Sequence, residues 1–94
     1  MKHPEDVKIG NIEFSSHALL KIEILKAHGV DVSRELVENV VRTPDRMDVG
    51  YKERLIAQKG LDDTHVLRVV YEALPDRIYI VTLYPGRRTR YEKD

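Results

Sequence analysis

Basic and aromatic side chains gather near the end of this sequence, in the segment RIYIVTLYPGRRTRYEKD at residues 77–94. The residues of this segment that suit RNA binding are Arg87, Arg88, Arg90 and Tyr91. Arginine binds phosphate through a planar fork of N–H donors, and tyrosine can stack on unpaired bases. The segment therefore predicts an RNA-binding surface. The alternative interpretation is a solvated basic end of the chain.

Four residues have side chains that suit the cleavage of RNA without a metal ion. Such a reaction needs a group that deprotonates the 2′-hydroxyl, a group that protonates the leaving 5′-oxygen, and cations that stabilise the phosphorane. The predicted catalytic residues are Arg68, His65, Tyr84 and Arg87. Histidine suits the acid or base role because an unperturbed imidazole titrates close to neutral pH. The alternatives are a solvated histidine at a strand end and tyrosines that pack at the sheet edge.

No metal-ligand set and no cofactor motif is predicted. His17 and His28 are eleven residues apart, which separates them by about 16 Å along a helix, so they cannot share an ion. The chain has no P-loop, dinucleotide-binding fingerprint or nucleophile elbow. It also has no cysteine, which excludes thiolate and disulfide chemistry. We therefore expect a protein that uses no cofactor and no metal.

The composition is that of a single globular domain, residues 1–94. Hydrophobic residues make up 41% and charged residues 34% of the chain, and no apolar run approaches the ~18 residues that would cross a bilayer. The N-terminus lacks the apolar region of a secretory leader, so we expect a cytoplasmic protein without a membrane partner. Sixteen basic and sixteen acidic residues cancel, which argues against nucleic-acid binding through the global field. A local patch is still predicted, because residues 65–94 carry six basic and four acidic residues.

Two helices are predicted over residues 16–28 and 33–42, so the helical part covers about 15–43. The expected capping and stop residues are Ser15 or Ser16, Gly29 and Ser33. Thr43–Pro44 ends the second helix because proline restricts the residue before it to extended conformations. The expected buried positions are Ala18, Ile22 and Leu25 in the first helix and Leu36, Val37, Val40 and Val41 in the second.

Strands are predicted over residues 7–14, 52–58, 65–73 and 77–84. Two helices followed by a strand meander predict an α+β fold, in which both helices cover one face of a twisted antiparallel sheet and the other face stays open. Alternation places Leu67, Val69 and Tyr71 opposite Arg68, which marks the open face because a lone arginine is rarely fully buried. The same period separates Tyr79, Val81 and Leu83 from Ile78, Ile80, Thr82 and Tyr84. The sheet part is expected over about 50–85, followed by a basic tail over 85–94.

Two long segments, within residues 12–93, resemble a known family. The stretch FSSHALLKIEILKAHGVDVSRELVENVVRTPDRM is similar to the opening of domain-of-unknown-function family 4258, which has an F-S-x-H-A helix, a glycine turn, a second helix and an x-P-D close. The stretch VLRVVYEALPDRIYIVTLYPGRRTRYEK resembles the closing strands and arginines of that family. The KAHGV turn also resembles BrnT-type toxins and, more remotely, the RelE superfamily.

The resemblance implies a RelE/BrnT-toxin-like fold, ribonuclease activity toward messenger RNA and a cognate antitoxin as partner. The sequence departs from the pattern of active toxins in its zero net charge and in His28, where an arginine often precedes the glycine. The second hypothesis is a non-catalytic interaction domain. Such a domain would use the open sheet face to bind a partner chain or a second copy of itself as a homodimer.

Overall fold

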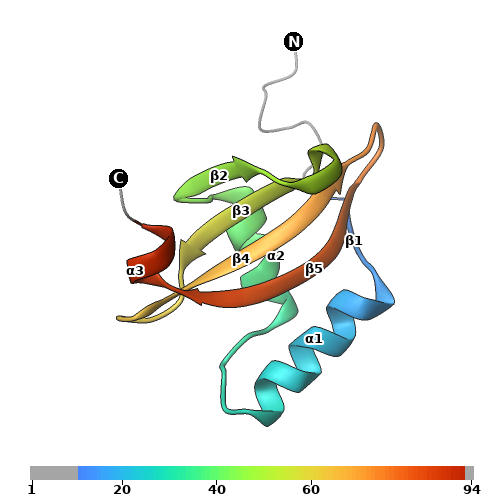
Figure 1. Ribbon diagram of the computed structural model, residues 1–94. Coiled ribbons are helices and arrows are strands. Elements are labelled where there is room, and N and C mark those ends of the chain that lie inside the picture. The colour runs from blue at the N-terminus through green and yellow to red at the C-terminus, as the bar shows by residue number, and fades with distance from the viewer. Residues whose placement is uncertain (1–10, 93–94) are drawn as a thin grey trace.

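The computed structural model describes residues 11–92, which form a five-stranded sheet with helices packed against it (Figure 1). The elements are β1 (Ile12–Phe14), α1 (Ser16–Ala27), α2 (Arg34–Arg42), β2 (Arg46–Val49), the 3-10 helix η2 (Tyr51–Glu53), β3 (Leu55–Gly60), β4 (His65–Ala73), β5 (Ile78–Arg87) and α3 (Arg88–Tyr91). The strand order is β1-β5-β4-β3-β2. The fold is therefore α+β, as predicted. The predicted strand over 7–14 falls partly outside the described residues.

Both long helices begin and end where their capping residues predict. The Ser15 Oγ atom accepts a hydrogen bond from the Ala18 amide at 3.0 Å, and the Ser33 Oγ atom accepts one from the Leu36 amide at 3.1 Å. These bonds satisfy amides that have no partner inside the helix. After α1, Gly29 adopts a φ of +81°, a left-handed conformation that glycine reaches without strain. Local sequence signals thus determine both helices.

One hydrophobic core joins α1 and α2 to the sheet. The long helices supply the buried residues Ala18, Ile22, Leu25, Val37, Val40 and Val41, and the sheet supplies Ala57, Leu67, Val69, Tyr71, Ile80 and Leu83. Leu36 packs at the edge of this core and is only half-buried. α1 contacts β5 and β1, whereas α2 contacts β3 and β4. The two helices therefore cover different strands of the sheet.

The sheet is mixed, so the expectation of an antiparallel sheet is wrong for one strand. β1 pairs with β5 in parallel, with Ile12 opposite Ile78 and Phe14 opposite Ile80, while all other pairs are antiparallel. The second unexpected strand is β2, which pairs with β3 at the other edge. Its sequence, RMDV, has little apolar alternation because three of its four residues are exposed. An edge strand of this kind owes its conformation to pairing with its neighbour.

A β-bulge changes which residues of β5 face the core. Val70 pairs with Thr82, but the next residue, Tyr71, pairs with Ile80, so Val81 is the extra residue. The Ser15 Oγ atom donates a hydrogen bond to the Val81 carbonyl at 2.8 Å and so gives this carbonyl of the bulge a partner. The bulge reverses the alternation, and both Ile80 and Leu83 are fully buried in the core. The predicted separation of these two residues onto opposite faces is therefore wrong.

Residues 85–92 are folded onto the sheet rather than forming a tail. β5 runs through Pro85 to Arg87, and α3 then turns back over the sheet, where Tyr91 packs against Gly86. In Figure 1, α3 lies beside the end of the sheet where β3 and β5 finish. The expected basic tail over 85–94 and the fully open second face are both corrected by this arrangement. Within residues 11–92, no helix has the length and apolarity needed to cross a bilayer.

Candidate functional site

The strand register divides the predicted catalytic residues between the two faces of the sheet. In the pairing of β4 with β5, His65 lies opposite Arg87, and Arg68 lies opposite Tyr84. Paired residues share a face, and neighbouring positions alternate between faces. His65 and Arg87 therefore lie on the side of Leu67 and the long helices, whereas Arg68 and Tyr84 lie on the side of α3.

Arg68 is the centre of a buried polar cluster. Only 6% of its surface is exposed. Its Nε donates to the Tyr84 hydroxyl at 2.9 Å, and its Nη1 donates to Asp48 Oδ2 at 3.2 Å and to the Gln58 side-chain oxygen. A buried guanidinium is tolerated only when its donors have such partners. The expectation that Arg68 marks an open face is therefore wrong.

Tyr91 of α3 closes this cluster from outside. Its ring centroid lies 4.3 Å from Cζ of Arg68 and 6.4 Å from the ring of Tyr84. The Tyr91 carbonyl accepts hydrogen bonds from Arg46 Nη1 at 3.0 Å and from Gln58 Nε2 at 3.4 Å. These contacts hold α3 on the sheet and exclude water from Arg68.

The charges inside the cluster stabilise one another. Burial acts to lower the pKa of Arg68, but the hydrogen bonds and charges of Tyr84 and Asp48 outweigh it and raise that pKa. Burial likewise acts to raise the pKa of Asp48, but Arg46 and Arg68 hold it below its usual value. The cluster is a satisfied ion-pair network under α3. Within it, the donors of Arg68 are occupied by Tyr84, Asp48 and Gln58.

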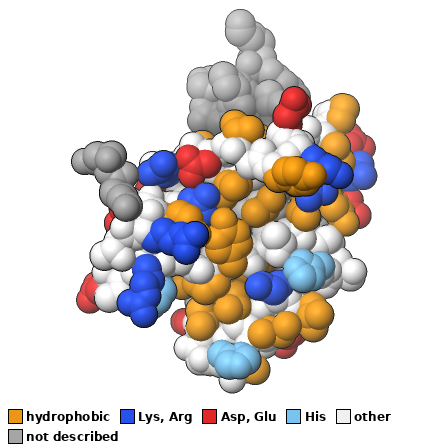
Figure 2. Space-filling model, in the orientation of Figure 1, with side chains coloured by type: hydrophobic (Ala, Val, Ile, Leu, Met, Phe, Trp, Pro, Cys, Tyr) orange, Lys and Arg blue, Asp and Glu red, His pale blue; other side chains and the backbone are white. Residues whose placement is uncertain are grey.

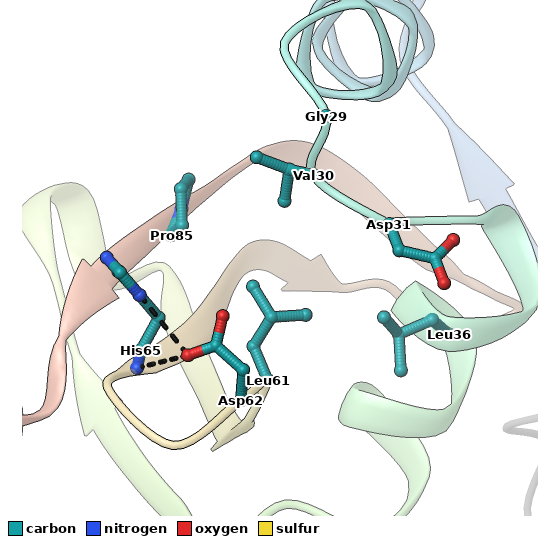
Figure 3. A pocket seen from close by; sticks show the side chains of 8 residues that line it. All are labelled: Gly29, Val30, Asp31, Leu36, Leu61, Asp62, His65 and Pro85. Atoms are coloured by element: carbon teal, nitrogen blue, oxygen red, sulfur yellow. Dashed lines mark hydrogen bonds and ion pairs between the residues drawn. The ribbon is translucent and has the colours of Figure 1, made fainter.

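His65 forms a second polar group with Asp62 at the turn between β3 and β4 (Figure 3), and the Thr64 hydroxyl also lies within hydrogen-bond distance of the His65 ring. Asp62 Oδ1 accepts hydrogen bonds from the backbone amides of Thr64 at 2.9 Å and His65 at 2.8 Å. The same oxygen lies 3.2 Å from Nδ1 of the His65 ring. The hydrogen bond from the Thr64 amide, with those from His65, lowers the pKa of Asp62. An ionised carboxylate therefore orients the imidazole.

Two surface hollows meet at His65 and Pro85. The apolar hollow, of about 490 Å³, is lined by Gly29, Val30, Asp31, Leu36, Leu61, Asp62, His65 and Pro85. The basic hollow, of about 370 Å³, is lined by His65, Pro85, Gly86, Arg87, Arg90 and Tyr91. Figure 3 shows the apolar hollow between the turn after α1, the start of β4 and the part of β5 around Pro85. Figure 2 shows several Lys and Arg side chains on the side of the molecule where α3 lies, and others elsewhere on the same face.

The predicted RNA-binding residues differ in how they are held. Arg87 and Arg90 are exposed at the basic hollow, and the Cζ atom of Arg90 lies 5.5 Å from the Tyr91 ring centroid. Arg88 is half-buried and donates from Nε to the Asp62 carbonyl at 2.8 Å. It also pairs with Glu92 at 2.8 Å. Arg88 therefore ties α3 to the β3–β4 turn, while Arg87 and Arg90 present their charge to the hollow.

No family model, curated protein or solved structure matches this chain. The function must therefore be argued from the site itself. Among residues 11–92, no group of three or more His, Asp or Glu side chains is arranged to hold a metal ion. What the described part of the chain brings together is an acid–base pair, His65 and Asp62, beside two exposed arginines.

Sequence reasoning missed Asp62, Asp48 and Gln58. A signal for Asp62 was present, because an Asp two residues before a Thr is typical of a turn in which the carboxylate accepts backbone N–H groups. Nothing local identifies Asp48 or Gln58. They come from β2 and β3, and they reach Arg68 only through strand pairing.

Proposed function

We propose that this protein is a metal-independent endoribonuclease of the RelE/BrnT toxin type that cleaves single-stranded RNA at the basic hollow. The observation that carries the proposal is the position of His65. Its imidazole is oriented by an ionised Asp62 and lines the same hollow as Arg87, Arg90 and Tyr91. Phosphate binding beside a positioned acid–base group is what phosphodiester cleavage needs.

The reaction follows from these roles. His65 removes the proton of a ribose 2′-hydroxyl, the 2′-oxygen attacks the adjacent phosphorus, and the bond from phosphorus to the 5′-oxygen breaks. The leaving 5′-oxygen takes up a proton from water. The products are a 2′,3′-cyclic phosphate and a 5′-hydroxyl. Arg87 and Arg90 stabilise the extra negative charge of the phosphorane, and Asp62 stabilises the imidazolium that forms on His65.

The order of elements supports the toxin part of the proposal. Two consecutive helices precede the longest strands of the sheet, as the resemblance to domain-of-unknown-function family 4258 and the BrnT and RelE toxins implies. On this proposal the physiological partners are messenger RNA and a cognate antitoxin. An antitoxin that covers the basic hollow would block phosphate binding without altering the fold.

A cleavage assay tests the proposal. The purified chain, incubated with a labelled single-stranded RNA and EDTA, is expected to release fragments that end in a 2′,3′-cyclic phosphate. Replacing His65 with alanine is expected to lower the rate by about 10²–10⁴-fold, the usual contribution of a general acid or base. Replacing His28 with alanine is the matched control, because His28 is exposed at the end of α1 and its ring lies 2.8 Å from the Ile24 carbonyl of that helix.

Two results would contradict the proposal. One is cleavage that His65→Ala and His28→Ala leave equally unchanged, since the activity would then arise elsewhere or from a contaminant. The other is a chain that neither cleaves nor binds RNA at low salt and whose overexpression does not slow growth.

A second function, a non-catalytic interaction domain, is favoured by exposed apolar side chains away from the hollows. On α1, Leu20 is 56% exposed, and at the β2 edge Val49 and Tyr51 are 72% and 82% exposed. Surface patches of this kind occur where a partner chain or a second copy binds. Size-exclusion chromatography separates the two functions. A homodimer that Leu20→Glu or Val49→Glu dissociates, in a protein without ribonuclease activity, would establish the second.

A further inference from the structure

The apolar hollow differs from the basic hollow in chemistry, although the two adjoin. Its walls are the half-buried side chains of Val30, Leu36, Leu61 and Pro85. Its charged groups, apart from the titratable His65, are the carboxylates of Asp31 and Asp62. A phosphate would be repelled there. An apolar, neutral group that offers hydrogen-bond donors would be accepted.

We infer that the apolar hollow binds a nucleobase of the RNA, next to the phosphate held in the basic hollow. The inference rests on the proposed function and deepens it. His65 and Pro85 line both hollows, so a ligand that fills both must have a neutral planar part and an anionic part on either side of the imidazole. A nucleotide has this composition.

The walls suit a planar ring because they come from two layers. Val30 lies in the turn after α1, and Leu36 lies in the first turn of α2; both belong to the helical layer. Leu61 and Pro85 belong to the sheet layer, at the end of β3 and in β5. Figure 3 shows these side chains around the hollow, with His65 at one end. Apolar walls with a few polar groups are the usual lining of a ligand pocket.

The carboxylates select among bases. Among residues 11–92, no hydrogen bond or ion pair engages the Asp31 side chain, and the residue is exposed. A carboxylate accepts hydrogen bonds from amino groups of bases, as it does from the N4 amine of cytosine. Guanine, adenine and cytosine carry an exocyclic amine, and uracil does not. The hollow is therefore expected to bind the amino-bearing bases more tightly than uracil.

Nucleoside 3′-monophosphates test the inference directly. In ¹⁵N-labelled protein, the guanosine, adenosine and cytidine compounds are expected to shift the backbone amides of Val30, Leu36 and Leu61. Inorganic phosphate is expected to shift Arg87 and Arg90 instead. The uridine compound is expected to bind several-fold more weakly than the guanosine compound. Shifts confined to the basic hollow with every nucleotide would overturn the inference and leave the ribonuclease proposal intact.

A substitution provides the second measurement. Replacing Leu36 with glutamate removes an apolar wall of the hollow and adds a negative charge to a hollow that already holds Asp31 and Asp62. The helix α2 should still form, because a helix favours an acid in its first turn. Guanosine 3′-monophosphate is expected to bind about tenfold more weakly, while the affinity for inorganic phosphate is unchanged. The matched control is Leu20→Glu, which makes the same change on an exposed face of α1.

The outcomes separate the two proposals. An equal loss of affinity for phosphate and nucleotide in a folded Leu36→Glu protein would overturn the nucleobase site, because the apolar hollow would then contribute nothing specific to the base. Binding of the nucleosides alone to the same amides supports the site even where RNA is not cleaved. Unchanged nucleotide affinity in a folded Leu36→Glu protein would overturn it.

Discussion

Replacing Gly86 with alanine tests whether Tyr91 holds α3 on the sheet. A Cβ atom at position 86 would lie 2.3 Å from Cε2 and 2.6 Å from Cδ2 of Tyr91, closer than real carbon contacts come. The strand cannot retreat, because Gly86 pairs with Val66 inside the sheet. The ring must therefore move, and with it the contact to Arg68.

The magnitude follows from these contacts. Adding a methyl group to a well-packed site costs about 1–3 kcal/mol. Tyr91→Ala, which removes the contact with Arg68 and the tilted pair with Tyr84, is expected to cost about 1–2 kcal/mol. In the Tyr91→Ala background, Gly86→Ala should be neutral or slightly stabilising, because alanine suits a strand better than glycine when nothing opposes its Cβ. The two changes should therefore couple by about 1–3 kcal/mol, the full cost of Gly86→Ala in the wild type.

Urea unfolding of the wild type, the two single variants and the double variant gives the coupling. Gly50→Ala is the matched control. Its Cβ would lie 2.9 Å from Cδ1 of Ile56, the end of a flexible side chain outside α3, so its cost is expected to stay below about 1 kcal/mol. Strictly additive costs for Gly86→Ala and Tyr91→Ala would refute the account of how α3 is held.

Three further predictions concern the charged groups. Arg68→Met is expected to lower the free energy of unfolding by about 3 kcal/mol in urea, because it leaves Asp48 without its buried partner; a loss below about 1 kcal/mol would contradict the ion-pair network. Asp48 has a lowered pKa in the folded state, so its stabilisation is present above the unfolded pKa, about 3.9, and is lost as pH falls through the folded value. The melting temperature of Asp48→Asn should therefore fall less than that of the wild type between about pH 4 and pH 2, and parallel curves would refute this. The third prediction concerns the variant in which Arg87 and Arg90 are both changed to alanine. Its plot of log affinity for single-stranded RNA against log salt concentration should be flatter by about 1.4, since each phosphate contact contributes about 0.7 to the slope. An unchanged slope would exclude these two arginines from the interface.

Local sequence determined the helices and the central strand. Ser15 and Ser33 cap α1 and α2 through bonds that span three residues, so the information needed to place each helix lies within one turn. The alternation of Leu67, Arg68 and Val69 likewise predicts two faces of β4 without knowledge of its neighbours. Short-range hydrogen bonds and the period of apolar residues are properties of a segment, which is why they can be recognised in the sequence.

Long-range contacts decided the rest. The sequence placed Arg68 on an open face because a lone arginine is rarely buried, but Asp48, Gln58 and Tyr84 come from three other strands and satisfy its donors. The arginines after Pro85 were predicted to form a tail, because the sequence does not show that Gly86 leaves space for Tyr91. That space matters only once α3 has folded back onto the sheet.

Long-range strand pairing also decided which of the predicted catalytic residues lie together. His65 and Arg87 were predicted as catalytic residues from their types, and the pairing of β4 with β5 brings them together while it separates them from Arg68 and Tyr84. Asp62, the carboxylate that orients His65, lies three residues before it, yet its role depends on the turn that joins β3 to β4. Residue types show which chemistry a chain can perform. Strand register decides which of those residues meet, because a shift by one residue moves a side chain to the opposite face of a sheet.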